Sequence, residues 1–321
     1  MSKTPQPPAR AADLAGAQRS IVHEGLTWLD IRDPRPAQVS ALRERFGFHP
    51  LHLDDVLSRI QRPKIDDNPE QGYLFLVLHF PVFNKTTRLP VISEVDIFVG
   101  DAYVITAHDG LLKPLGRLAE EAAGEEQSRV DLMGRGSGYL LYRIIATLIG
   151  ACFPMLFRLD EKLDRLDAAI FEDDVLRIVQ ELSFLRRDII SLRRIVRPNI
   201  PVVRSLEVRE RPFLHVDEDA YFGDLTDGLN RIWDMLEEQK EIIDGLDATI
   251  GSLNSHRINR EIKIFTVISV IFLPMTLLAS VLGMNVPIPF AEEPLSFFGA
   301  LLIMGALGGA MLLFFRFRRW I

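Results

Sequence analysis

The stretch SVLGMNVPIPF, residues 280–290, separates two apolar segments near the C-terminal end of this chain. No charged residue occurs within 264–282 or within 295–315. As α-helices rising about 1.5 Å per residue, both segments are roughly 30 Å long, which matches the hydrocarbon core of a bilayer. The sequence therefore predicts two transmembrane helices, about 262–282 and 295–315, joined by an extracytoplasmic loop at 283–294. Two buried helices of a soluble protein are the alternative.

Basic residues flank both predicted spans. Arg257, Arg260 and Lys263 precede the first span, and Arg316, Arg318 and Arg319 follow the second. Because Lys and Arg accumulate on the cytoplasmic side of membrane helices, we predict a multi-pass protein of the cell (inner) membrane. Both termini are then cytoplasmic, including a short basic tail at 316–321. Binding of lipid headgroups is a second explanation for these charges, and it gives the same topology.

Composition limits what the rest of the chain can be. The 321 residues are 48% hydrophobic and 25% charged, with a net charge of −7. This acidic balance argues against a nucleic-acid partner. The single cysteine, Cys152, excludes an intrachain disulfide framework and a cysteine-based zinc site. Residues 1–19 are polar and rich in Pro and Ala, without the apolar core of a signal peptide, so we expect a disordered tail there.

Strand and helix patterns alternate from 20 to 110, which predicts an α/β cytoplasmic domain. The expected strands are GLTWLDI, YLFLVLHFPVF, SEVDIFVG and AYVITAH, and the expected helices are RPAQVSALRERFG and HPLHLDDVLSRI. Gly47 is the expected stop of the first helix. From 111 to 220, apolar residues recur every three or four positions. This spacing predicts a helical hairpin region, interrupted at Pro198 and Pro201.

The two arms of that hairpin carry opposite charges. The acidic positions are Asp160, Glu161, Asp164, Asp167, Glu172, Asp173 and Asp174, and the basic positions are Arg186, Arg187, Arg193, Arg194 and Arg197. Such faces are typical of solvated helices joined by salt bridges. A weak divalent-cation surface on the acidic arm is the alternative.

One long stalk helix is predicted from 221 to 282, continuing into the first span. An apolar stripe along it comprises Leu225, Leu229, Ile232, Leu236, Ile243, Leu246, Ile250 and Leu253. A second stripe, which we call the seam, comprises Gly245, Ala248, Ser252, Ser255, Asn259, Ile262, Thr266, Ser269, Leu273, Thr276, Ser280 and Gly283. The seam advances in steps of three and four, the period of a coiled coil. A helix of this length needs partners along both stripes.

The seam consists mainly of small or polar residues, which has two explanations. Such residues allow membrane helices to approach closely, or they line a water-filled path. Asn259, Thr276 and Asn285 favour the path, because polar groups at membrane depth usually face a cavity. Two spans cannot enclose a pore, so we expect a ring of identical chains in the bilayer. In the second span, the spacing of Gly305 and Gly309 predicts packing by an outer helix.

Three segments stand out: HPLHLDDVLSRIQRPK (49–64), YFGDLTDGLN (221–230) and IFLPMTLLASVLGMN (271–285). Through them the chain resembles the CorA family of divalent-cation channels. The last segment carries the Gly-Met-Asn signature of the family at the end of the first of two C-terminal spans. The resemblance runs from about residue 20 to the C-terminus. It implies a funnel-shaped homopentamer with an α/β cytoplasmic domain, a long stalk helix that lines the pore, and a short outer helix. It also implies influx of Mg²⁺, with Co²⁺ or Ni²⁺ sometimes accepted.

Family positions and the seam together give a set of expected site residues. The selectivity mouth is Gly283, Met284 and Asn285, the pore lining is Asn259, Ile262, Thr266, Ser269, Leu273, Thr276 and Ser280, and the gate candidates are Phe265 and Leu273. Ser280 stands where a glycine is common in the family. Phe265 stands where a gate-forming leucine can occur, one position off the seam.

The resemblance also implies feedback by Mg²⁺. In the family, intracellular Mg²⁺ bridges acidic residues between subunits and holds the pore shut. Asp224 matches one of these acids, while the family partner falls near Asn84, where an amide would weaken the site. Asp227, or Asp66 and Asp67, are possible substitutes. The alternative is that Asp224 only caps or solvates the stalk.

The signature suits the chemistry of Mg²⁺, which sheds water reluctantly and prefers octahedral oxygen. A ring of Asn285 amides and backbone carbonyls freed at Gly283 would bind the water shell without stripping it. Glu292 and Glu293 in the loop would concentrate cations by their field. Because no carboxylate lines the expected pore, the ion leaves as easily as it enters. The membrane potential drives inward flow, and no nucleotide is needed.

Three other functions are weighed against this one. A proton-coupled Zn²⁺ transporter of the same superfamily is the first, although those often depart from Gly-Met-Asn and the seven histidines here lack metal-ligand spacing near the pore. A non-conducting membrane scaffold or sensor is the second, and the unbroken polar seam argues against it. An enzyme is the third, but the sequence contains no Walker A loop, His-Glu-x-x-His motif or Ser/His/Asp arrangement.

Overall fold

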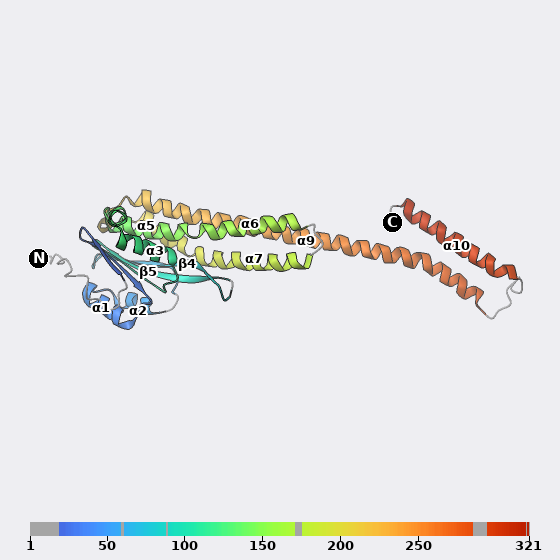
Figure 1. Cartoon of the computed structure of the whole chain (residues 1–321), viewed down its shortest axis with the longest axis horizontal. Helices are drawn as coiled ribbons and strands as arrows, with labels where there is room; N and C mark the ends of the chain where they lie inside the picture. The colour runs from blue at the N-terminus through green and yellow to red at the C-terminus, as the bar shows by residue number, and fades with distance from the viewer. Residues whose placement is uncertain are drawn as a thin grey trace. The chain divides into compact units, whose positions relative to one another are not determined.

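The computed structural model describes residues 19–58, 61–87, 89–170, 175–284, 294–318 and 320 (Figure 1). Its contacts divide the chain into two units, 1–246 and 247–321. The long helix α9, Glu218–Leu282, contributes to both units. The predicted disordered tail lies outside the described residues, apart from Arg19, which begins the first strand.

A six-stranded sheet is the base of the first unit. Its strands are β1 (Arg19–His23), β2 (Leu26–Arg32), β3 (Lys64–Asn68), β4 (Tyr73–Asn84), β5 (Leu89–Gly100) and β6 (Tyr103–His108). Their order is β1-β2-β6-β5-β4-β3, in which β2 and β6 pair in parallel and the other neighbours pair antiparallel. Every residue from Tyr73 to Pro81 is buried. Helices cover both faces of the sheet, which explains why the YLFLVLHF run is continuously apolar instead of alternating.

Two glycines set the ends of elements in this layer. Glu24 and Gly25 join β1 to β2 with φ values of 44° and 91°. Positive φ at both central residues is the geometry of a two-residue hairpin turn that matches the twist of the strands. Gly47 caps α1 (Pro36–Phe46) at φ 69°, and its N–H bonds to the carbonyl of Arg43. The predicted helix stop is therefore confirmed.

Helices pack on the two faces of the sheet in separate groups (Figure 1). Helices α1 and α2 (Pro50–Leu57) cover one face through a core that includes Leu42, Phe48, Phe75 and Phe98. The other group comprises α3 (Lys113–Gly124), α4 (Glu126–Met133), α5 (Ser137–Gly150), α7 (Val175–Val196) and α8 (Asn199–Val208), with the short 3₁₀ helix η2 (Pro212–Leu214). The break predicted at Pro198 is the junction between α7 and α8, whereas Pro201 lies in the first turn of α8 and does not interrupt it.

Three described stretches are long and apolar enough to cross a membrane. They are Ser137–Ala169, Ala220–Leu282 and Phe297–Phe317. The first consists of two helices, α5 and α6 (Phe153–Ala169), and 44% of its most apolar window is buried inside the chain, against 6% for each of the others. Leu140, Ile144 and Leu148 of this stretch lie in the core of the first unit. The apolar character of α5 is therefore satisfied by protein, whereas the other two stretches need lipid or further chains.

Most of the predicted apolar stripe of the stalk packs inside the first unit, where its members from Leu225 to Leu246 are buried. Ile250 and Leu253 belong to the second unit; Ile250 is buried and Leu253 is half-buried. Gln239 lies among the members in the first unit and donates to the carbonyl of Leu156 at 3.1 Å and to Asp160 Oδ1 at 2.6 Å. The stripe and this buried amide fix the register of α9 against α6.

The arginines of the hairpin pair with a different helix from the one expected. Arg193 forms an ion pair with Glu237, and Arg186 lies 3.3 Å from Asp244, both on α9. The guanidinium of Arg193 also lies over the ring of Trp233. Salt bridging is therefore confirmed, but α9 supplies these acidic partners because it lies alongside α7. Glu172, Asp173 and Asp174 are outside the described residues.

The second unit consists of the C-terminal part of α9 and helix α10, Pro294–Phe317. Val267 and Ile271 of α9 form a small core with Phe315 of α10, and Met275 and Met311 pack against it. Gly308 allows the closest approach, because a Cβ there would lie 2.1 Å from the Sδ-bound methyl carbon of Met275. Gly305 and Gly309, the predicted packing pair, have nothing within 4 Å of a Cβ position. The expectation that Gly305 and Gly309 pack against another helix was therefore wrong for contacts within the chain. Both residues lie beside the line along which Gly308 contacts Met275.

Candidate functional site

The seam is exposed along its whole described length. All twelve seam residues, from Gly245 to Gly283, are exposed. They include large apolar side chains such as Leu273, which is 73% exposed, and Ile262, which is 55% exposed. Phe265 beside the seam is 69% exposed. Nothing in the described part of this chain covers the stripe.

The seam lies on the side of α9 opposite to the helix α10. With about 100° of rotation per residue, Val267, Ile271 and Met275 centre on one direction of the helix. Residues 266, 269, 273, 276 and 280 centre about 180° away from it. Since α10 packs on the first direction, it leaves the second free. The seam side of α9 therefore faces away from α10.

Hydroxyl groups on the seam present acceptor oxygens outward. Thr266 Oγ1 donates to the carbonyl of Ile262 at 2.7 Å, and Thr276 Oγ1 donates to that of Phe272 at 2.9 Å. Ser255 Oγ does the same to Gly251 at 2.9 Å. A hydroxyl that has given its proton to the helix backbone keeps only lone pairs for other partners. The seam is thus suited to accept hydrogen bonds from water that surrounds a cation.

The first two residues of the signature directly follow α9, which ends at Leu282. The N–H of Gly283 bonds to the carbonyl of Ala279 at 3.0 Å, and that of Met284 to Val281 at 3.3 Å. Gly283 does not have the left-handed conformation that would open the helix end; its lack of a side chain matters because a Cβ would lie 3.2 Å from the oxygen of Ala279. Asn285, Glu292 and Glu293 lie outside the described residues.

Asp224 lies in the first unit, inside α9 and with an exposed side chain. Its Oδ2 accepts a hydrogen bond of 2.9 Å from the hydroxyl of Tyr142 on α5. Burial, followed by this bond to Asp224, raises the pKa of Tyr142. The N-terminal end of α9 is capped by another residue, Asp217, whose Oδ1 accepts a hydrogen bond of 3.2 Å from the N–H of Ala220. Asp224 is therefore not an N-cap. Asp227 is exposed one turn further along α9.

The substitute acids are engaged in structural pairs. Asp67 bonds to Arg211 Nε at 2.6 Å and to Arg209 Nη1 at 3.1 Å. Burial alone would raise the pKa of Asp67, but the hydrogen bonds and charges of these arginines hold it below its ordinary value. Asp66 lies 3.1 Å from Lys64 Nζ.

Asn84 also has a local structural role. Its Oδ1 accepts from the N–H groups of Thr86 and Thr87, at 2.9 and 3.2 Å, in the turn after β4. No group of three or more His, Cys, Asp or Glu among the described residues is arranged to hold a metal ion.

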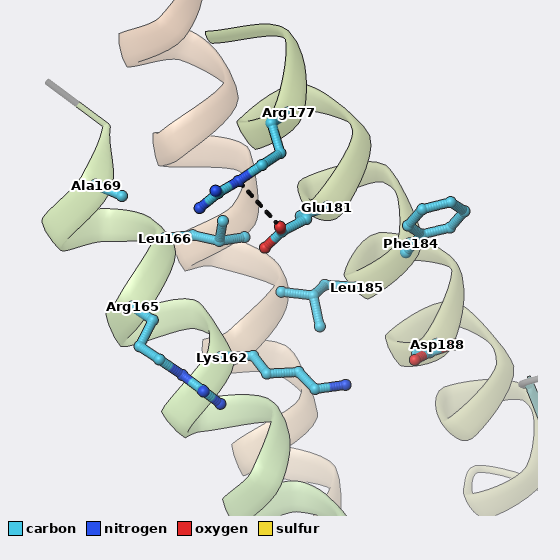
Figure 2. A pocket seen from close by; sticks show the side chains of 9 residues that line it. All are labelled: Lys162, Arg165, Leu166, Ala169, Arg177, Glu181, Phe184, Leu185 and Asp188. Atoms are coloured by element: carbon cyan, nitrogen blue, oxygen red, sulfur yellow. Dashed lines mark ion pairs between the residues drawn. The ribbon is translucent and has the colours of Figure 1, made fainter. Parts of the chain in front are cut away.

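The gap between α6 and α7 is lined by side chains of both charges. Figure 2 shows its lining, to which α6 contributes Lys162 and Arg165 and α7 contributes Arg177, Glu181 and Asp188. Arg177 Nε lies 3.4 Å from Glu181 Oε1. Burial raises the pKa of Asp188. The gap has a volume of about 430 Å³, and three of its lining side chains are cationic.

Sequence reasoning found the seam but not what surrounds Asp224. The Tyr142 hydroxyl, and the ring cluster that Tyr142 forms with Tyr139 and Tyr221, come from helices far apart in the sequence. Their only sequence signal is a tyrosine pair spaced by three residues on α5, which also suits an ordinary core. The Lys263–Trp320 contact, with the ammonium 5.8 Å from the ring centroid, was likewise not expected.

Comparisons with known proteins show what the whole chain is similar to. The family model described as "CorA-like Mg2+ transporter protein" matches residues 23–319. The chain is 30% identical to the putative metal ion transporter YfjQ of Bacillus subtilis, covering 91% of this chain and 89% of that protein. It is 27% identical to the cobalt/magnesium transport protein CorA of Thermotoga maritima (92% and 83%). It is 25% identical to the zinc transport protein ZntB of Pectobacterium atrosepticum (95% and 91%). The complete structure of the CorA magnesium transporter from Methanocaldococcus jannaschii shares the fold, with a TM-score of 0.80 at 21% identity over 95% of this chain and 94% of that one.

Proposed function

The chain belongs to the CorA-like Mg²⁺ transporter family, whose members transport divalent cations across membranes, and we propose that it is a channel for Mg²⁺ influx. Co²⁺ and Ni²⁺ are secondary substrates in this proposal. The observation that carries it is the exposed seam on the side of α9 opposite to α10. A uniform membrane-facing helix would have no reason to place acceptor hydroxyls along one line.

The seam becomes a pore when identical chains form a ring. In a homopentamer, five copies of α9 would face one another through their seams while each α10 lies outside. Leu273 and Phe265, both more than two-thirds exposed in one chain, would then form apolar constrictions and act as the gate. The threonines at 266 and 276 would form polar rings on either side of Leu273. The ring explains why large apolar side chains on the seam have no cover within the chain.

Ion passage in this proposal keeps the water shell of Mg²⁺. Thr266 and Thr276 accept hydrogen bonds from that water, because their protons are already given to the backbone. Gly283, Met284 and Asn285 form the mouth that selects the hydrated ion, and Glu292 and Glu293 raise the local cation concentration. A potential of 100 mV contributes roughly 2.3 kcal/mol per charge, or about 4.6 kcal/mol for a divalent ion. No nucleotide is needed.

Intracellular Mg²⁺ closes the proposed channel. Asp224 and Asp227 lie one turn apart on the exposed side of α9, and a cation between them and a neighbouring chain would hold two stalks together. The Tyr142 hydroxyl positions the carboxylate of Asp224. The proposal places the protein in the inner membrane with both termini in the cytoplasm, since positive charges flank the cytoplasmic ends of both spans.

Ion uptake into proteoliposomes tests this function. Purified protein is reconstituted with an internal Mg²⁺ dye, and a potassium diffusion potential makes the interior negative. We expect Mg²⁺ entry that depends on the potential and is insensitive to a proton gradient. Zn²⁺ entry that requires a proton gradient would instead assign the chain to zinc transport, which the relative ZntB makes the second candidate. Absence of flux for Mg²⁺, Co²⁺, Ni²⁺ and Zn²⁺ would favour a non-conducting scaffold. Light scattering of the same sample is expected to give five times the 36.4 kDa chain mass.

A further inference from the structure

A groove runs between α9 and α10 in the second unit. Its volume is about 880 Å³, and its walls are mainly apolar, with Ile264, Ile268 and Phe272 on the α9 side. Along α9 it extends from Arg260 and Lys263 to Met275. At about 1.5 Å per residue, the 12 positions after Lys263 cover about 18 Å, close to one leaflet of a hydrocarbon core about 30 Å thick.

Glycines of α10 keep this groove open. Gly305 and Gly309 line it, and a Cβ at either position would meet no atom within 4 Å. The intervening contact is made by Gly308 against Met275. The two helices therefore touch along one line and separate beside it, where small residues leave room that a larger side chain would fill.

One end of the groove is cationic and aromatic. Arg260, Lys263 and Trp320 line that end. The Lys263 ammonium lies 5.8 Å from the centroid of the Trp320 ring, and the backbone N–H of Trp320 donates to the carbonyl of Phe315 at 3.0 Å. Among the described residues, Arg260 has no carboxylate partner. Lys, Arg and Trp at this depth are the residues that contact lipid headgroups.

We propose that this groove binds one anionic phospholipid of the bilayer. Its phosphate lies between Arg260 and Lys263, within reach of the indole N–H of Trp320, and one acyl chain lies along the wall opened by Gly305 and Gly309. Charge complementarity selects an anionic headgroup, and the apolar length beyond it matches a leaflet. Basic pockets between membrane helices on the cytoplasmic side bind such lipids in other proteins.

The lipid site is separate from the seam. The groove is on the α10 side of α9, whereas the seam faces the opposite direction. Lipid binding can therefore be altered by substitutions that leave Thr276 and the rest of the seam unchanged. The site also does not depend on which ion the protein transports.

Quenching of tryptophan fluorescence by brominated lipid tests the proposal. Full-length protein is reconstituted in phosphatidylcholine with a rising fraction of brominated phosphatidylglycerol, and the experiment is repeated with brominated phosphatidylcholine. Trp28 and Trp233 lie in the first unit and supply a constant background, so quenching reports on Trp320. Each cation near an anionic surface changes affinity about fivefold. We expect phosphatidylglycerol to be preferred about 25-fold.

Matched variants distinguish a built site from general attraction to the surface. Arg260→Gln with Lys263→Gln is expected to remove the preference, whereas Arg257→Gln, which removes a cation that is paired with Glu261 at 3.7 Å outside the groove, should keep it. Gly309→Leu should fill the groove and remove the preference with both cations intact, while Gly299→Leu, at another open position on α10, should not.

Three results would overturn the proposal. They are equal quenching by the two lipids in the wild-type protein, an unchanged preference in Gly309→Leu, and efficient oxidative cross-linking of Gly305→Cys between copies. Cross-linking would mean that a neighbouring chain fills the groove. The native Cys152 does not interfere with that experiment because it is buried in the first unit.

Discussion

Replacing Thr276 by Val tests whether the seam faces the ion. The substitution keeps the shape of the side chain and removes one oxygen, which in the structure has given its proton to Phe272 and presents only acceptor lone pairs. The cost to folding is small, because the carbonyl of Phe272 keeps the helical N–H of residue 276 as a donor. We expect a change of less than about 1 kcal/mol in stability.

The effect on flux should be larger than the effect on stability. A hydrogen bond to the water shell of the ion has a net value of about 1 kcal/mol. If a passing ion uses two of the five threonines in the ring, their loss raises the barrier by about 2 kcal/mol, which is roughly a 30-fold decrease in rate. Thr276→Ser, which restores the acceptor, should recover most of the flux.

Thr226→Val is the matched control. Thr226 Oγ1 makes the same bond to the backbone four residues earlier, at 3.1 Å to Phe222, but it is buried in the first unit and lies off the seam. Potential-driven Mg²⁺ uptake into proteoliposomes is compared for the four proteins at equal oligomer content. Flux of Thr276→Val within twofold of wild type, or equal losses in Thr276→Val and Thr226→Val, would refute the assignment of the seam to the ion path.

Four further predictions concern other residues. Asp224→Ala should leave transport active but weaken its inhibition by internal Mg²⁺, and unchanged inhibition in a titration of internal Mg²⁺ would mean that the sensor lies elsewhere. Asn285→Ala should abolish uptake with an unchanged oligomer mass by light scattering, whereas normal flux would contradict the role of the mouth. Asp67→Asn should destabilise the first unit by about 1 kcal/mol at pH 7, measured by urea unfolding. Because Arg211 lowers the folded-state pKa of Asp67, this difference in stability from wild type should shrink as the pH falls below about 4. Burial raises the pKa of Cys152 to about 12, so a thiol reagent at pH 8 should label it only in urea, and rapid labelling of native protein would contradict its burial.

Several features of the fold followed from local sequence. The strand GLTWLDI, the helix stop at Gly47 and the apolar stripe of the stalk were predicted from composition and period, and the structure has them. These features depend on local backbone preference and on which side of an element is apolar, both of which a sequence contains. Strands β1 and β3 were missed, because RSIVH and KIDDN are short edge strands without the apolar alternation of a half-buried strand.

Contacts between distant segments were less accessible. The acidic arm on α6 was the expected partner of the arginines on α7, but Glu237 and Asp244 of α9 are paired with them. Likewise Asp67, considered as a metal ligand, is held by Arg211. In each case the residue types were right for an ion pair, but charge alone does not state which of several oppositely charged side chains lies nearby.

The sequence by itself determined the two C-terminal apolar helices, the long stalk with its two stripes, and the resemblance through Gly-Met-Asn. Periodicity and hydrophobicity are properties of one segment, so they need no knowledge of the rest of the chain. Only the tertiary structure decided that α10 packs on Val267, Ile271 and Met275, and so which side of α9 stays open. It also decided that Gly308 makes the close contact while Gly305 and Gly309 leave a groove. The angle at which two helices meet selects one among neighbouring glycines, and that angle depends on side chains from both helices together.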